Sequence, residues 1–366
     1  MDSFKLKYII SFLTGIGTSA FFLLTPLYIN ELRANDFTLS IVVASFFFAS
    51  MLSYVFFGRY SDARAVRKNL IVIGLLLMSI AYALHFFANS VWLLLMVRLF
   101  AGAASGIYTG PILAYLASGK EYKVHLSSFY GFGSLGWAIG FFAATLLLKY
   151  YGFAEIFLLF SAPLFAAFLL STKIEKEKMA QIDVPLIPIG LIKRNLSLYL
   201  SFFVRHVSAH AMFTFLPLYM LFLKSPKELI GPLLAVNQFI QFFVMNSIPR
   251  LKWNSRTVFR AGLLLSTLSF FVIALLPTYY FVLIPMVIIG FAWSFLSVGA
   301  NLVLVEQNVE KATVTGLLWG ISSLALIIGP IMGGILATIF GLREMIFITA
   351  GISLFGFAVE MFLRSK

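Results

Sequence analysis

The chain alternates between long apolar stretches and short polar connections. Each stretch is long enough to cross a hydrocarbon core of about 30 Å as an α-helix, which satisfies its own backbone hydrogen bonds in lipid. We therefore predict an all-α membrane protein with twelve transmembrane helices. They are expected over residues 8–29, 37–57, 69–88, 91–117, 127–149, 153–172, 196–223, 229–248, 258–276, 281–305, 314–339 and 345–363.

Three short strings occur twice, about half a chain apart and in the same order. They are Pro-Leu-Tyr at Pro26 and Pro217, Gly-Leu-Leu-Leu at Gly74 and Gly262, and Gly-x-x-Glu at Gly152 and Gly341. In so apolar a chain, a duplicated half predicts two six-helix, pseudo-symmetric bundles. We expect an N-terminal bundle over 1–172, a central cytoplasmic loop over 173–194 and a C-terminal bundle over 195–366.

Composition agrees with a chain that lies mostly in lipid. Only 11% of its residues are charged, against about 25% in soluble proteins, and 61% are hydrophobic. The absence of cysteine excludes disulfides and thiolate chemistry. No phosphate-binding loop and no nucleophile–base set stands out, so we expect neither ATP-driven transport, nor an enzyme, nor a cofactor.

The net charge of +13 is a topology signal. In the predicted topology, seven lysines and arginines lie inside spans or on the side away from the termini, namely Arg98 and Arg205, and Arg33, Lys149, Lys224, Lys227 and Arg343. The other twenty of the 27 share the side of the termini. By the positive-inside rule, both termini face the cytoplasm of a multi-pass protein in the cell membrane. The basic excess therefore requires no nucleic-acid partner.

Two local patterns add a family resemblance. The connection after the second stretch contains Gly58, Asp62 and Arg67 in a run of basic residues, and the fourth stretch carries Arg98 followed by glycines. With the duplicated halves, they resemble the major facilitator superfamily over essentially the whole chain. The resemblance implies a substrate site between two rocking halves. It also implies that Gly58, Asp62 and Arg67 form a conformational latch of the outward-open state, although an ordinary solvated loop is the alternative.

Glycines at helix-packing spacing are expected to let helices approach closely or slide. The family's exporters often carry Gly-Pro-x-x-Gly-Gly in span five, whereas here the string lies at the repeat-equivalent place in span eleven, which weakens the inference to an exporter. These packing or gating candidates are Gly102, Gly106, Gly136, Gly140, Gly329, Pro330, Gly333 and Gly334.

Span seven holds the polar residues that most clearly break the repeat. Arg205, His206 and His210 stand where the first half has Thr14, Gly15 and Ser19, at roughly 15–22 Å along the helix. Ionisable residues at this depth are costly unless they face water, a partner or a ligand. A structural hydrogen-bonded cluster is the alternative. We expect no metal, because further ligands are lacking.

Further candidates for substrate binding or coupling come from helices that line the centre in the resembled family. Besides Arg98 they are Tyr108, Asn237, Gln241, Trp293 and Asn301. Each of these polar or aromatic side chains serves equally well as a contact between helices.

The sequence therefore predicts a monomeric secondary transporter that works by alternating access, with a small solute and membrane lipid as its partners. The basic span residues favour an anionic organic solute. If protons drive transport, His206 or His210 is expected to carry them, because imidazole titrates near neutral pH. One alternative is a multidrug-type efflux antiporter with an apolar cavity. An alternative of another class is a non-transporting sensor or partner-binding membrane protein.

Overall fold

The computed structural model describes residues 3–33, 36–177 and 180–363. The terminal residues 1–2 and 364–366, which we expect in the cytoplasm, lie outside these ranges. Every regular element within the ranges is helical, which confirms the all-α prediction. Eleven of these helices are long and apolar enough to cross a membrane. The twelfth long helix, α8 (Leu196–Phe222), carries Arg205 and two histidines, which lower its mean hydropathy.

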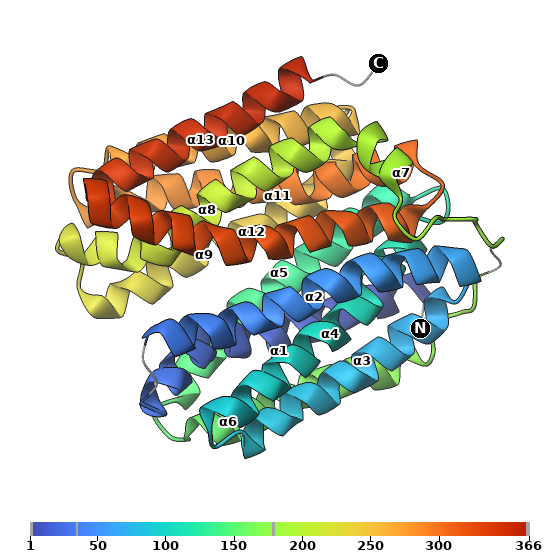
Figure 1. The fold of residues 1–366 in the computed structure, drawn as a ribbon, viewed down its shortest axis with the longest axis horizontal. Helices are drawn as coiled ribbons and strands as arrows, with labels where there is room; N and C mark the ends of the chain where they lie inside the picture. The colour runs from blue at the N-terminus through green and yellow to red at the C-terminus, as the bar shows by residue number, and fades with distance from the viewer. Residues whose placement is uncertain (1–2, 34–35, 178–179, 364–366) are drawn as a thin grey trace. The chain divides into compact units, whose positions relative to one another are not determined.

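The chain divides into two compact units (Figure 1). Unit 1 comprises residues 1–186 and 308–323. Within it, α2 packs on α4, α1 on α5 and α6, and α3 on α4 and α6. Its elements are α1 (Ser3–Glu31), α2 (Asp36–Arg64), α3 (Arg67–Ala83), the 3₁₀ turn η1 (Leu84–Phe87), α4 (Val91–Leu116), α5 (Tyr122–Leu147), α6 (Phe153–Ser171) and the first part of α12 (Lys311–Phe340).

Unit 2 comprises residues 187–307 and 324–366. Within it, α10 packs on α11 and α13, α8 on α13, and α9 on α11. Its elements are α7 (Ile189–Arg194), α8, α9 (Lys227–Ser247), η2 (Ile248–Arg250), α10 (Ser255–Ala274), η3 (Tyr279–Val282), α11 (Leu283–Gln307), the rest of α12 and α13 (Leu342–Phe362). Residues 308–323 thus group with unit 1, although they were expected in the C-terminal bundle.

The first part of α12 belongs to unit 1 because small residues let it pack closely on α2. A Cβ on Gly58 would lie 2.5 Å from the carbonyl oxygen of Ala312, and one on Gly316 would meet the carbonyl of Tyr54. Ser50 and Ser323 continue the contact, with 3.1 Å between their Oγ atoms. The glycines leave the two backbones in direct contact along this crossing.

The end of α2 corrects the predicted helix boundary. The helix was expected to stop at residue 57, but it runs to Arg64, so Gly58 and Asp62 lie on its last turns rather than in a loop. It ends where Ala65 takes a positive φ of 54°. The amide of Val66 then donates to the carbonyl of Ser61, a closure typical of helix C-termini. The helix continues past the apolar stretch because its last turns pack on α12 and not on lipid.

Helix α5 crosses α1, and α12 crosses α8, in the same register. A Cβ on Gly140 would meet Ser19 Oγ and lie 2.8 Å from the carbonyl oxygen of Ile16. A Cβ on Gly329 would lie 2.7 Å from His210 Cβ and 2.9 Å from the carbonyl oxygen of Val207. Ile16 and Ser19 match Val207 and His210 at the offset that separates Pro26 from Pro217. The duplication is therefore repeated in the contacts of this crossing.

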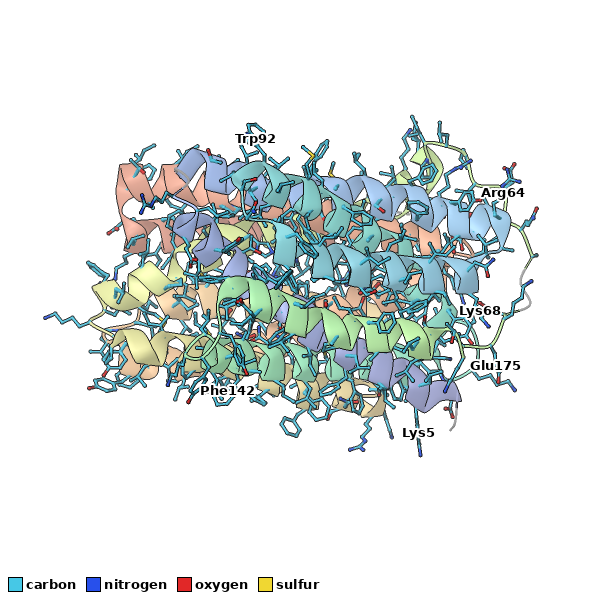
Figure 2. All side chains as sticks on the ribbon, turned by 90° about the horizontal axis from the view of Figure 1, so that it is seen from below. Lys5, Arg64, Lys68, Trp92, Phe142 and Glu175 are labelled. Carbon is cyan, nitrogen blue, oxygen red and sulfur yellow. The ribbon has the colours of Figure 1, made fainter. Side chains whose placement is uncertain are left out.

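The outside of unit 1 has the polarity that a membrane protein needs. Trp92 and Phe142 are 75% and 73% exposed and project from its flanks (Figure 2). Lys5, Arg64 and Lys68 lie together at one end. Exposed aromatic side chains on a flank suit lipid, and clustered lysines and arginines suit the cytoplasmic interface.

Candidate functional site

The first polar cluster in the spans, called here the binding cluster, comprises Arg205, His206, His210 and Trp293 in unit 2. Arg205 is 2% exposed, and its Nε donates to Ser266 Oγ at 2.9 Å. Its guanidinium lies 5.6 Å from the centre of the Phe270 ring and 5.7 Å from that of Trp293. Among the described residues it forms no ion pair. The guanidinium is thus held by one hydroxyl and two aromatic rings, and it keeps donors that a ligand can use.

The two histidines continue this cluster along α8. The His206 ring stacks on Phe202 with 4.4 Å between centroids and lies 5.2 Å from both His210 and Trp293. Its Nδ1 atom has no hydrogen-bond partner among the described residues. His210 is half-buried and close enough to Arg205 for the two charges to interact. The structure therefore brings together the three repeat-breaking residues and Trp293.

The glycine string of α12 lies directly behind this cluster, which gives a first prediction. Gly329→Ala places a methyl group against His210 and the carbonyl of Val207. We expect transport to fall and stability to drop by about 1–3 kcal/mol, because neither backbone can retreat from the added group. Gly334→Ala is the matched control, because its Cβ meets only the Phe215 ring at 3.5 Å. Uptake rates and melting temperatures of the two variants, measured side by side, test this; equal losses would contradict it.

The other predicted glycines lie at close helix approaches as well. Gly102 and Gly106 on α4 lie against Phe46 and Ser53 of α2. Gly136 on α5 lies against Phe12 of α1, and Gly333 on α12 against Ala211 of α8. Pro330 stands inside α12. These contacts account for the glycines by packing, whereas a part in gating stays a prediction.

Arg98 lies in unit 1, on α4. The side chain is 4% exposed, and its guanidinium lies 4.6 Å above the Phe46 ring. Its Nε atom has no hydrogen-bond partner among the described residues. Leu94 and Ala101, on the same helix, belong to the apolar core of unit 1. Arg98 thus packs between helices of unit 1 and, like Arg205, forms no ion pair among the described residues, whereas only Arg205 lies beside two histidines and a tryptophan.

The remaining candidates are spread over three helices. Tyr108 of α4 packs against Gly74 of α3. On α9, Gln241 Nε2 donates to Asn237 Oδ1 at 2.8 Å, as their spacing of four predicts, and both side chains are buried. On α11, Asn301 Nδ2 donates to the carbonyl of Ser297 at 2.9 Å. The hydrogen bonds satisfy part of each amide of Asn237, Gln241 and Asn301 within its own helix, whereas the contact of Tyr108 with Gly74 is one of packing.

A second group, called here the latch cluster, comprises Asp62, Arg67, Thr313 and Glu177 in unit 1. The carboxylate of Asp62 is fully buried. Its Oδ2 accepts hydrogen bonds from the backbone N–H of Thr313 at 2.8 Å and from Thr313 Oγ1 at 2.9 Å. Its Oδ1 accepts from Arg67 at 3.1 Å. Asp62 therefore caps the N-terminus of α12 from another helix, where the helix dipole favours a negative charge.

Two further contacts fix the start of α12 in the same place. Lys311 Nζ donates to the carbonyl of Ala117 at 2.6 Å, just past the end of α4. A cation there complements the negative end of the α4 dipole. The first turn of α12 is thus joined to the ends of both α2 and α4.

Two residues of the latch cluster, and two that contact the binding cluster, were not predicted. Phe202 stands four residues before His206, so helical spacing could have indicated it. Ser266, Thr313 and Glu177 come from distant segments, and no local signal marks them. Within the described ranges, no three His, Asp or Glu side chains gather as metal ligands do.

Comparison with known proteins places these features in a family. Residues 8–324 match the family model described as Major Facilitator Superfamily. The multidrug resistance protein MdtG of Proteus mirabilis (strain HI4320) is 23% identical over 376 residues, which cover 94% of this chain and 91% of the relative. The uncharacterized MFS-type transporter MJ1560 of Methanocaldococcus jannaschii is 22% identical over 355 residues, which cover 92% of each of the two chains.

Two solved structures share the fold. The human organic anion transporter MFSD10 (TETRAN) superposes with a TM-score of 0.79 at 15% identity, covering 98% of both chains. The Major Facilitator Superfamily transporter FucP, in its outward conformation, superposes with a TM-score of 0.81 at 16% identity, covering 100% of this chain and 99% of that one. At these identities the likeness concerns the fold.

Proposed function

This chain belongs to the Major Facilitator Superfamily, and we propose that it is a secondary transporter that moves a small organic anion across the cell membrane by alternating access. The observation that supports an anionic solute is Arg205, a buried guanidinium that forms no ion pair among the described residues and lies beside Trp293 and two histidines. A cation at that depth is costly unless a counter-charge reaches it. A carboxylate or phosphate group of the solute would supply this charge and accept paired N–H donors.

Proton coupling would follow from the position of His210. A proton on this imidazole would be repelled by the charge of Arg205, which stands five residues earlier on the same helix. An anion bound to Arg205 would offset that repulsion, so the anion and the proton would bind with positive cooperativity. Transport of the anion together with a proton is the form of coupling that this arrangement supports.

The latch cluster would govern the conformational change. Two halves that rock around a central site must make and break contacts at their ends. The cap that Asp62 gives to α12 is such a contact, because it exists only while α2 and α12 are together. We place both termini and this cluster on the cytoplasmic side, because twenty of the 27 lysines and arginines lie on that side in the predicted topology.

The binding of an anion can be tested on the purified protein. A panel of organic anions, sugars and lipophilic cations is tested by thermal shift at two pH values. Anions are expected to raise the melting temperature, since a ligand at 100 times its Kd stabilises by about 2.7 kcal/mol. In Arg205→Ala we expect affinity to fall roughly tenfold or more, because a charge-assisted hydrogen bond is lost.

Lys252→Ala is the control for Arg205→Ala, since it removes the same charge from an exposed position. Anion stabilisation that is equal in both variants would refute the role of Arg205. Stronger stabilisation at the lower pH, lost in His210→Gln, would support proton coupling.

The second candidate is a multidrug exporter, which the names of the MdtG relatives favour. Stabilisation by lipophilic cations and not by anions would support it. A sensor without transport is distinguished from both by solute flux into proteoliposomes.

A further inference from the structure

The linker after α6 lies against the latch cluster. The side chains of Ile174 and Val184 are 1% and 2% exposed. The backbone N–H of Ile182 donates to the carbonyl of Asp62 at 3.2 Å. Arg59, one turn before Asp62 on α2, donates through Nε to the carbonyl of Val184 at 2.9 Å. Connecting segments normally run over the surface with few such bonds, so this attachment is specific.

One side chain of the linker enters the latch itself. Glu177 Oε2 accepts a hydrogen bond from Arg67 at 2.9 Å. The other terminal nitrogen of the same guanidinium donates to Asp62 Oδ1. Arg67 is 5% exposed and Glu177 is 20% exposed, so water screens this bridge only in part. The linker carboxylate and the latch carboxylate thus share one cation.

The geometry of Arg67 makes these two contacts depend on each other. A guanidinium is planar and presents its donors in a fixed fork. One terminal nitrogen also lies 3.2 Å from Ser118 Oγ, so the group is held from several directions. If Glu177 moved away, this nitrogen would keep two neutral acceptors, Ser118 Oγ and the carbonyl of Ala114, and would lose its charged and shortest contact, so the fork would be held toward Asp62 less firmly.

We propose that Glu177 is a positioning residue of the latch, which acts through Arg67 on Asp62 and makes the linker part of the device that holds α12. The inference rests on the proposed role of Asp62 and adds to it the segment that regulates its strength. A change in the linker at Glu177 would alter how often α12 leaves α2, although no hydrogen bond or ion pair joins Glu177 to α12 among the described residues and only a longer-range attraction links it to Lys311.

The reporter for this test is a single cysteine at Ser323, in a chain that has no other cysteine. Ser323 is 3% exposed and meets Ser50 across the α2–α12 crossing. A water-soluble methanethiosulfonate reagent can reach it only when the helices separate. While the separated state is minor, the labelling rate is proportional to its population.

In the Ser323→Cys background, Glu177→Gln is expected to raise the labelling rate about fivefold, the size typical of a partly exposed ion pair. Glu177→Asp, which keeps the charge, should stay close to the parent. Glu175→Gln is the matched control, because Glu175 is an exposed linker carboxylate at the same end of unit 1 (Figure 2). Melting temperatures should be equal for the whole set, which excludes unfolding as the cause. Equal labelling in Glu177→Gln and Glu175→Gln would overturn the proposal.

Asp62→Asn separates this inference from the proposed function. If Asp62→Asn raises labelling and Glu177→Gln does not, only the role of Glu177 is wrong. If neither does, the latch itself is wrong. The inference also requires that Glu177→Gln add nothing in the Asp62→Asn background, because a residue that acts through Asp62 has no effect without its charge. Additive effects would show that Glu177 acts elsewhere.

Discussion

Oxidation of the Ser50→Cys/Ser323→Cys double variant is expected to abolish transport, and reduction to restore it. The two Oγ atoms lie 3.1 Å apart, with side chains 1% and 3% exposed, so two sulfur atoms at these places can meet after small rotamer changes. A disulfide there would fix the α2–α12 crossing. If transport requires these helices to separate, every crosslinked molecule is inactive. Uptake into proteoliposomes before and after reductant measures this.

A second pair of hydroxyls provides the control. Thr267 and Ser353 join α10 to α13 inside unit 2, with 2.9 Å between their oxygens, and both are buried. A disulfide in Thr267→Cys/Ser353→Cys holds two helices of one bundle, which alternating access leaves together. This variant should transport with or without oxidant. Full activity of the oxidised Ser50→Cys/Ser323→Cys protein, with the crosslink shown on a gel, would exclude separation of α2 from α12 during transport.

Asp62→Asn is expected to weaken the latched state by about 2 kcal/mol, which is roughly a thirtyfold change in the ratio of latched to separated molecules. The buried carboxylate accepts two hydrogen bonds from Thr313 and one from Arg67. The neutral amide loses the electrostatic attraction to the N-terminus of α12. It also has only one oxygen, so its NH2 group must face either the donors of Thr313 or the Arg67 guanidinium, which is a donor as well. Net transport should fall, because one state of the cycle is no longer reached often enough.

The measurements for Asp62→Asn are the initial rate of uptake and the labelling rate of Ser323→Cys. Asp183→Asn, an exposed carboxylate of the linker, is the charge-matched control and should behave as the parent protein. Thr313→Val should produce a smaller change, since the backbone N–H of residue 313 still donates to Asp62. An unchanged labelling rate in Asp62→Asn would contradict the latch.

The sequence predicts the helices well and their ends less well, for a physical reason. Hydropathy detects the part of a helix that lies in lipid. Helix α2 continues to Arg64 and α5 begins at Tyr122, because tertiary contacts such as Asp62 to Thr313 and His125 to Tyr8 stabilise their polar end turns. The placement of Asp62 in a loop was wrong on this account. No local signal predicts that Ala65, a residue that rarely takes a positive φ, ends the helix.

The candidate site was predictable in part. The repeat singles out Arg205, His206 and His210, and helical spacing places the histidines on one face, as found. Arg98 carries the same signal, yet it lies over Phe46 beside the apolar core of unit 1. A sequence gives the depth of a charge along a helix, but its surroundings depend on which helices pack around it. Glu177 illustrates the same limit, because its partner is 110 residues away.

The matching helix crossings of Gly140 and Gly329 bear on how such carriers diversify. The same backbone contact accommodates a serine hydroxyl at residue 19 and an imidazole at residue 210. Since the glycine supplies the fit, the side chain opposite it is free to vary without loss of the fold. A duplicated fold holds such a position twice, so one copy can carry an ionisable group in a span while the other keeps a small hydroxyl. If the binding cluster selects the solute, as we propose, single substitutions at this position would change the solute preference and leave the architecture unchanged.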